Sequence, residues 1–272
     1  MGLFDRGIEI KSRHQVDAMR RAGLVVGETL ELLRAAVRPG VTTGELDAIA
    51  YEAIRSRGAT PSFLGYHGFP ASICTSVNAE VVHGIPGTRV LAEGDVISID
   101  CGAVLDGWHG DAAITVVLGA VDPEVSELVR VTEAALWAGI AAASLGGRVN
   151  DISEAVEDSV RAAGGYGILE DYTGHGIGTA MHQAPDVPHV SVRGRSPRLV
   201  EGLVLAVEPM VTLGTHETVL LDDDWTVVTA DGSCAAHQEH TFTLTDRGAW
   251  VLTALDGGEA ALSALGVPFG GR

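Results

Sequence analysis

Two short segments of the chain share one design, and each ends in a carboxylate. The segments are Leu91–Asp100 and Leu199–Glu208, and each contains a glycine turn, an aliphatic run and a final acidic residue. An aliphatic run of this kind predicts a buried strand. Burial of a carboxylate is costly unless the group is paired or binds a cation. The two matching acids, Asp100 and Glu208, therefore predict a shared ion site.

A third carboxylate follows from a turn signal. Asp106–Gly107 is typical of a two-residue hairpin turn, which would place Asp111 opposite Gly102 on the returning strand. Asp100 and Asp111 would then be diagonal neighbours, roughly 7 Å apart at the backbone, and both side chains would reach metal ions about 3.5 to 4 Å apart. A bulge at Gly110 is the alternative, and it would break this register.

Further candidate ligands lie downstream. Glu239 begins an alternating segment typical of a strand, and His175 and His182 lie in a glycine-dense stretch. Gly174–Gly178 lacks the spacing of a dinucleotide-binding loop, and we expect its glycines to let the backbone approach a metal-bound histidine. We interpret the two histidines as a ligand and a proton donor.

Two more histidines, His237 and His240, flank Glu239. The zinc-protease motif HExxH needs two histidines one helical turn apart, and this strand-like segment does not provide that arrangement. We expect His237 and His240 to be surface or sheet histidines.

The elements that would position these residues occur in a repeated order. The segments 41–58 and 149–164 both open with a helix-capping residue, continue with apolar residues at helical spacing and stop at a glycine. Together with the matching strands they predict two duplicated αβ halves, at about 12–120 and 124–250, within one catalytic domain that spans 1–272. A chance likeness of two ordinary αβ stretches is the alternative.

Periodicity defines the expected elements more closely. It predicts helices near 14–36, 43–57, 124–144 and 151–163, and strands near 71–77, 80–84, 96–104, 111–118, 204–212, 226–230 and 240–245. The tail after about residue 254 is rich in glycine and alanine, and we expect it to fray or to lie over the surface.

Composition excludes several classes of protein. The 272 residues are 46% hydrophobic, which is enough for a large core without disulfides, and the three cysteines are scattered, which indicates a reducing compartment. The net charge of −18 disfavours nucleic acid as a specific partner. Lys11 is the only lysine and lies in the N-terminal lead-in, which argues against Schiff-base chemistry. No segment has the apolar length of a membrane span.

The chain resembles the type I methionine aminopeptidases from about Ile8 to Thr245. The resemblance rests on seven polar residues: Asp100, Asp111, His175, Glu208, Glu239, His83 and His182. It implies an α+β fold of the pita-bread type, with pseudo-two-fold halves and an antiparallel sheet. It also implies cotranslational removal of the initiator methionine from nascent proteins whose second residue is small and uncharged.

The same resemblance assigns roles. Asp100 and Asp111 would bind one divalent ion, and a second ion would use the set Asp111, His175, Glu208 and Glu239, with Asp111 and Glu239 bridging. Four carboxylates and one imidazole suit Mn, Fe or Co at least as well as Zn. The two ions would generate a bridging hydroxide that attacks the scissile carbonyl. Glu208 would be the general base, His182 would hydrogen-bond the oxyanion, and His83 would contact the scissile amide nitrogen.

The methionine pocket resembles that of the family less closely. Six apolar or aromatic residues occupy the matching positions: Phe63, Tyr66, Phe69, Cys74, Met181 and Trp225. The family commonly has cysteine at Phe63, tyrosine at Phe69 and phenylalanine at Met181. These departures affect the expected width of the pocket and leave its expected location unchanged.

Two other functions stay open on the sequence alone. An Xaa-Pro aminopeptidase-like enzyme usually carries a sizeable extra N-terminal domain, and Asp100 comes early for such a chain. A non-catalytic binding protein on the same fold would have lost metal ligands, and each ligand is present. We expect a cytoplasmic monomer that acts on nascent polypeptide N-termini. Transient contact with the ribosome is left open, because no docking module is visible.

Overall fold

The computed structural model describes residues 7–272, so Met1–Arg6, which belong to the predicted domain, lie outside the described residues. Its helices are α1 (Arg13–Ala36), α2 (Thr43–Ser56), α3 (Pro123–Ala142), α4 (Val149–Ala163) and α5 (Glu259–Ala264). The first four agree with the predicted helices to within two residues at either end. None of the described helices is both long and apolar enough to cross a bilayer.

The strands are more numerous than periodicity predicts, because several are only two or three residues long. They are β1 (Thr60–Pro61), β2 (Ile73–Val77), β3 (Glu80–Val82), β4 (Val96–Leu105), β5 (Trp108–Val117), β6 (Gly167–Ile168), β7 (Gly174–Gly176), β8 (Gln183–Val187), β9 (Val204–Val207), β10 (Met210–Thr212), β11 (Thr218–Leu220), β12 (Val227–Thr229), β13 (Ala235–His237), β14 (Glu239–Thr245) and β15 (Gly248–Val251).

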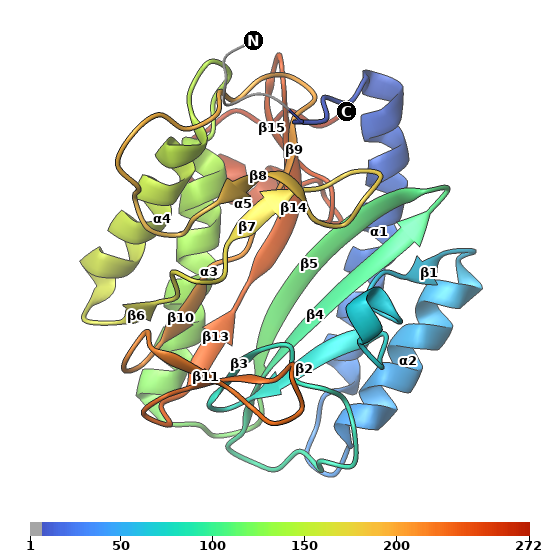
Figure 1. The fold of residues 1–272 in the computed structure, drawn as a ribbon, viewed down its shortest axis with the longest axis vertical. Helices are drawn as coiled ribbons and strands as arrows, with labels where there is room; N and C mark the ends of the chain where they lie inside the picture. Colours follow the sequence, from blue (N-terminus) through green and yellow to red (C-terminus); the bar gives the residue numbers. More distant parts are fainter. Residues whose placement is uncertain (1–6) are drawn as a thin grey trace.

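A curved antiparallel sheet connects the two parts of the chain (Figure 1). Within residues 7–272 its strand order is β1-β4-β5-β14-β9-β7-β8, with β2 also paired to β4 and β15 to β14. Two smaller sheets, β13-β10-β6 and β11-β12-β3, lie at one end of it. Because β5 from the first part pairs with β14 from the second, the central strands bring the predicted ligand segments side by side.

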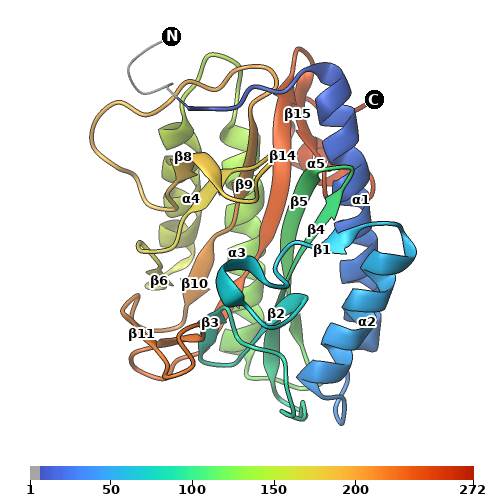
Figure 2. The same ribbon diagram turned by 45° about the vertical axis from the view of Figure 1, so that its right-hand side comes forward.

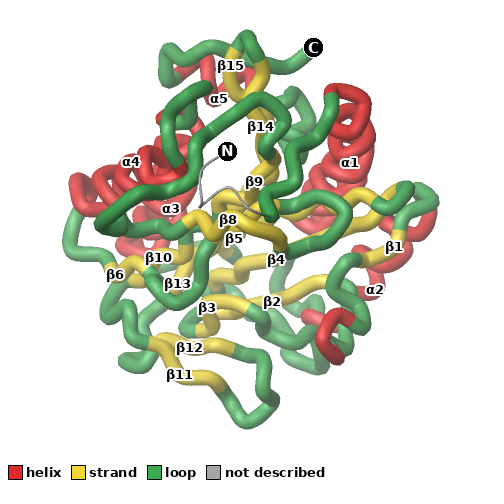
Figure 3. The backbone as a smooth tube through the Cα atoms, turned by 45° about the horizontal axis from the view of Figure 1, so that its top comes forward, coloured by secondary structure: helices red, strands yellow, loops and turns green. Residues whose placement is uncertain are grey.

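Helices cover one face of this sheet. Helices α1 and α2 lie toward one lateral edge of the molecule and α3 and α4 toward the other (Figure 2). Figure 3 shows the same two pairs in red, α1 and α2 to the right of the strands and α3 and α4 to the left. Ile99 and Cys101, on either side of Asp100, are buried in the core beneath α1 and α2. Phe242 and Leu244 of β14 are buried in the core with α3 and α4. Strand alternation therefore sends Asp100 to the face away from the helices.

Glycine at position 110 allows α1 to pack closely. A side chain there would place its Cβ 2.8 Å from the backbone nitrogen of Gly23 in α1. The register of β4 and β5 continues past Gly110 without a bulge, so the alternative that a bulge breaks the hairpin is wrong. Gly110 is a point of close contact between helix and sheet.

Two expectations about the second part of the chain are wrong. The strand predicted at 204–212 is divided into β9 and β10, which lie in different sheets, because Pro209 has no N–H to continue a ladder. The expectation that the C-terminal tail frays is also wrong, since α5 buries Leu262 completely and Gly270 donates a hydrogen bond to the carbonyl of Ala249. The other alternative, a tail that lies over the surface, agrees with the exposure of Leu255 and Leu265.

Candidate metal centre and substrate pocket

Register alone places three carboxylates on one face of the sheet. Asp100 on β4 and Glu239 on β14 both pair with Ala113 of β5, from its two sides. Asp111 lies two residues before Ala113 and therefore shares its face. Asp111 pairs with Gly102, which confirms the register predicted from the Asp106–Gly107 turn.

The remaining two predicted ligands lie on the next strands of the same face. His175 on β7 and Thr241 on β14 both pair with Ala206 of β9. Glu208 lies two residues after Ala206, and Glu239 two residues before Thr241, so both side chains project on the side of His175. Glu208 is the residue at which the chain leaves β9, directly before Pro209. Five strand segments thus deliver the five predicted ligands to one face.

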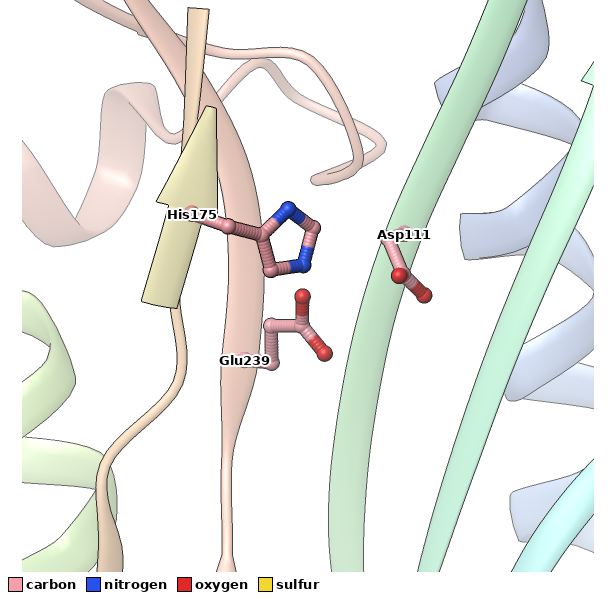
Figure 4. Close-up of side chains that lie close together, drawn as sticks. All are labelled: Asp111, His175 and Glu239. Carbon is pink, nitrogen blue, oxygen red and sulfur yellow. The ribbon is translucent and has the colours of Figure 1, made fainter. Parts of the chain in front are cut away.

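The side chains converge in space as the register requires. Figure 4 shows Asp111, His175 and Glu239 pointing toward one another from β5, β7 and β14. One ligand atom from each of these three lies within 4.8 Å of the other two. A second group of the same tightness consists of Glu208, His237 and Glu239. Glu239 belongs to both groups, whereas Asp100 belongs to neither.

Hydrogen bonding leaves His175 suited to bind a metal. Its Nδ1 lies 2.9 Å from the carbonyl oxygen of Gly176, and since a carbonyl only accepts, Nδ1–H is the donor. The lone pair of the neutral ring is therefore on Nε2, which lies 3.4 Å from Oε1 of Glu208. Metal-binding histidines commonly donate their second ring nitrogen to a fixed acceptor in this way.

Burial concentrates negative charge in the site without a compensating cation. Burial raises the pKa of Asp111 to about 7. It raises the pKa of Asp100, Glu208 and Glu239 well above the usual carboxyl range, and the negative charge of Asp111 raises them further. Among residues 7–272 no lysine or arginine forms an ion pair with these four carboxylates. Their close basic neighbours are His175 and His237, whose pKa values burial lowers to about 3, so both rings are neutral near pH 7.

Several buried side-chain atoms that could bind a metal ion also have no hydrogen-bond partner. These atoms are Oδ1 of Asp100, Oδ1 of Asp111, Oε1 of Glu239 and Nε2 of His237. Orphaned buried polar atoms are rare in folded proteins and call for an explanation such as a bound ion. A divalent cation would offset the repulsion between the carboxylates and would bind the side-chain atoms that have no partner. The residues present therefore fit a site for divalent metal ions.

His237 is a member of the site that the sequence interpretation missed. It lies on β13, is 2% exposed, and burial lowers the pKa of its imidazole to about 3. Of the two alternatives expected for His237, the surface position is wrong and the sheet position is confirmed, since it pairs with Met210 of β10. A signal for it was present, because residues two apart on an extended chain share a face and His237 precedes Glu239 by two. His240 is a sheet histidine as expected, hydrogen-bonded to Thr253 on the other face.

A cavity of about 230 Å³ has the five predicted ligands in its lining, and its other walls are mostly apolar or aromatic. Every predicted pocket residue lines it: His83, His182, Phe63, Tyr66, Phe69, Cys74, Met181 and Trp225. The sequence interpretation missed five further lining residues, namely Val82, Tyr172, Thr173, Met210 and His237. The volume is below the roughly 300–1,000 Å³ of pockets for drug-sized ligands, so the cavity suits a single side chain.

His83 and His182 line this cavity together with the carboxylates. The hydroxyl of Tyr66 lies 2.8 Å from Nδ1 of His182, whose ring centroid is 4.3 Å from that of His175. Burial lowers the pKa of His182, with a smaller contribution from His67. Burial and the proximity of His182 lower the pKa of His83 to about 4. Both rings are therefore neutral near pH 7 and can donate one N–H each.

His83 has an unusual backbone. Its φ is +61°, in the left-handed region that residues other than glycine seldom adopt. The next residue, Gly84, has no room for a side chain, because a Cβ there would lie 2.2 Å from the carbonyl oxygen of Thr75. This tight crossing directs the chain so that His83 lies between Tyr172 and Trp225.

The N-terminal lead-in supports the loop that carries His182. Lys11 is buried, with its Nζ 3.1 Å from the carbonyl oxygen of Glu9 and 3.3 Å from Oε1 of Gln183. Glu9 accepts hydrogen bonds from Gln183 and Thr179. A Cβ at Gly178 would lie 2.6 Å from both Glu9 and Lys11. At this end of the glycine-rich stretch, the missing side chain makes room for the lead-in instead of for a metal-bound histidine.

A larger hollow of about 460 Å³ lies elsewhere, beside Arg13 and Arg247. Arg13 forms exposed ion pairs with Glu201 and Asp246. Because its charges are paired and open to solvent, this hollow does not have the buried, unpaired donors of the carboxylate site.

Comparisons with known proteins agree with the site. A model of metallopeptidase family M24 matches residues 17–246. Methionine aminopeptidase 1 of Mycobacterium tuberculosis is 54% identical over 254 residues, which are 91% of this chain and 96% of that protein. The crystal structure of methionine aminopeptidase from Rickettsia prowazekii is similar with a TM-score of 0.88 and 38% identity, over 90% of this chain and 99% of that one.

Prolidase from Pyrococcus furiosus is similar in fold alone, with a TM-score of 0.71 and 20% identity over 92% of this chain and 66% of that one. Together with the curved antiparallel sheet, these neighbours confirm the predicted α+β fold of the pita-bread type.

Proposed function

The chain belongs to metallopeptidase family M24, and on that premise we propose that it is a methionine aminopeptidase. Such an enzyme is a metal-dependent hydrolase that removes the initiator methionine from nascent proteins and peptides whose second residue is small and uncharged. The observation that carries this proposal is a buried carboxylate–imidazole cluster that lines one part of a cavity of about 230 Å³, whose other walls are mostly apolar or aromatic. The cavity has room for one amino-acid side chain, and the cluster lies where that residue's carbonyl would be.

Family membership implies divalent metal ions, and we propose two of them, of Co, Mn, Fe or Zn. Asp100 and Asp111 would hold one ion. The set Asp111, His175, Glu208 and Glu239 would hold the second, with Asp111 and Glu239 shared between the two. Four buried carboxylates that would repel one another without cations support a pair of ions. Bound ions would lower the pKa of water and polarise the scissile carbonyl.

The chain's own residues divide the remaining work. Glu208, at the edge of the cluster, would accept the proton of the attacking water as general base. His182 would donate its Nε2–H to the oxygen that becomes negative in the transition state. His83, which also lines the cavity, would contact the scissile amide nitrogen.

The cavity wall would select methionine. Phe63, Phe69, Cys74 and Met181 form one buried apolar cluster, against which Tyr66 and Trp225 pack. An unbranched thioether makes favourable contacts with aromatic edges and sulfur atoms, and the wall is built from such groups. A charged side chain in this cavity would lose its hydration without gaining a partner.

The physiological setting is also part of this proposal. We propose a single catalytic domain across 1–272 that works as a cytoplasmic monomer on the N-termini of nascent polypeptides. Of the alternatives, an Xaa-Pro aminopeptidase-like activity is supported by fold similarity alone. A non-catalytic binding protein would have no need for five convergent ligands, and this chain has all five.

The proposal is tested with a metal-stripped preparation to which Mn, Co, Fe or Zn is returned. We expect methionine release from Met-Ala-Ser only when metal is present, and none from Met-Lys. Absence of release with every metal would support the binding protein instead. Activity confined to Met-Pro would support the proline-specific enzyme.

A further inference from the structure

His237 is placed like a metal ligand, although it is not among the five residues expected to bind metal. Its Nε2 lies 3.9 Å from Oε2 of Glu208 and 4.0 Å from Oε2 of Glu239. These distances are too long for hydrogen bonds, and Nε2 is buried without any partner among the described residues. A buried imidazole nitrogen that faces two carboxylates and has no hydrogen-bond partner needs a physical explanation.

The position of His237 is fixed by the surrounding strands. Its backbone N–H donates to Oγ1 of Thr115 at 3.0 Å and to Oγ of Ser98 at 3.2 Å. Its carbonyl accepts from Oγ1 of Thr115 at 2.6 Å, and it pairs with Met210 of β10. The buried hydroxyls of Ser98 on β4 and Thr115 on β5 therefore fix the backbone of His237. A ligand held in this way is preorganised, because little freedom is lost when an ion binds.

The distances agree with three donors around one ion. Metal–nitrogen and metal–oxygen bonds of about 2.0–2.2 Å separate neighbouring donor atoms by roughly 3–4 Å. We propose that His237 is a sixth protein ligand, whose Nε2 binds the ion held by Glu208 and Glu239. This inference rests on the proposed function, since it concerns the same metal centre.

A sixth ligand of this type would alter which metals the site prefers. The ion at Glu208 would then be bound by two imidazoles, from His175 and His237, in place of one. Imidazole favours the later divalent metals, whereas oxygen-rich sites suit Mn²⁺. The added nitrogen should therefore strengthen the binding of Co²⁺ or Zn²⁺ more than that of Mn²⁺.

The chain provides a matched control three residues away. His240 is a partly buried histidine near the start of β14, and its Nδ1 bonds to Oγ1 of Thr253 at 2.8 Å on the helix-covered side. The ring of His240 lies 5.2 Å from that of Trp137, remote from the carboxylates. His237→Gln and His240→Gln make the same chemical change on opposite faces of the sheet.

The test is calorimetric titration of Co²⁺ and Mn²⁺ into the metal-free wild type and both variants, with the visible spectrum of bound Co²⁺ as a second readout. We expect His237→Gln to weaken the affinity of one site for Co²⁺ by at least about 10–100-fold, the loss that follows removal of a residue hydrogen-bonded to a metal ligand. The affinity for Mn²⁺ should fall less. It should also change the Co²⁺ spectrum, while His240→Gln changes neither. Co²⁺ affinity and spectrum equal to wild type in His237→Gln would overturn the proposal.

A second measurement covers a variant that fails to fold. In wild-type protein with ¹⁵N-labelled histidine, saturation with Zn²⁺ should move two imidazole nitrogens to metal-bound shifts, and a single moved nitrogen would overturn the proposal. Both experiments measure metal binding without peptide. A wild type that binds Co²⁺ through His237 but releases no methionine would therefore refute the proposed function and leave this inference standing.

Discussion

Replacement of Tyr66 by phenylalanine should slow catalysis through His182. The Tyr66 hydroxyl lies 2.8 Å from Nδ1 of His182, whose lowered pKa leaves the ring neutral. Burial raises the pKa of Tyr66, so the hydroxyl stays protonated, and we expect it to donate to Nδ1. This bond fixes the tautomer in which Nε2 carries the proton. Nε2–H is then available for the oxygen that becomes negative during the reaction.

The size of the effect follows from one neutral hydrogen bond. Such a bond contributes about 0.5–1.5 kcal/mol, which corresponds to roughly a twofold to tenfold decrease in kcat. The phenylalanine ring keeps the apolar surface that Tyr66 presents to the cavity, so KM should change little. The assay is steady-state release of methionine from Met-Ala-Ser with saturating metal.

A double-mutant cycle gives the decisive comparison. In a His182→Ala background the Tyr66→Phe change should have no further effect on kcat, because the partner of the hydroxyl is gone. Tyr172→Phe is the matched control, since Tyr172 lines the same cavity and its hydroxyl makes no hydrogen bond among the described residues. If Tyr66→Phe slows the His182→Ala enzyme as much as the wild type, the reasoning is wrong.

Three further predictions follow from the same geometry. His182→Ala should lower kcat by about 10²-fold with little change in KM, and an undiminished kcat would remove its oxyanion role. In metal-free protein, the stability of Asp111→Asn relative to wild type should increase as the pH rises from 3.8 toward about 7. The reason is that Asp111 ionises in the unfolded chain over this range while its raised pKa opposes ionisation in the folded protein. Urea unfolding in chelator at a series of pH values measures this, and a difference in unfolding free energy that does not change with pH would contradict it. Gly110→Ala should destabilise the protein by about 1–3 kcal/mol, because its Cβ would meet Gly23. An unchanged urea midpoint would show that α1 moves aside at no cost.

Local sequence signals predicted the carboxylates well. The Asp106–Gly107 turn has φ of +52° and +79°, as a two-residue hairpin with both central residues left-handed requires. This turn sets the register of β4 and β5, and hence the relation of Asp100 to Asp111. The continuation from β5 to β14 is a contact between distant segments, and no local pattern predicts it. The resemblance to a family supplied that part.

Short elements were harder to predict for physical reasons. Strands such as β7 and β13 have three residues, too few for alternation to be recognised. This obscured the role of His237, which shares the face of Glu239 only if the chain is extended through Gln238. In α5 the alanine- and glycine-rich sequence concealed a helix anchored by the single fully buried side chain of Leu262.

The single lysine of the chain offers a way to measure local motions at the substrate pocket. Lys11 is almost fully covered, and burial lowers the pKa of its amine to about 8. An acylating reagent reaches this amine only after the lead-in separates from Thr179 and Gln183. The acylation rate of Lys11 therefore measures how often the segment that carries Met181 and His182 opens locally. Unmodified wild-type protein thus contains its own reporter of how often this wall of the pocket opens.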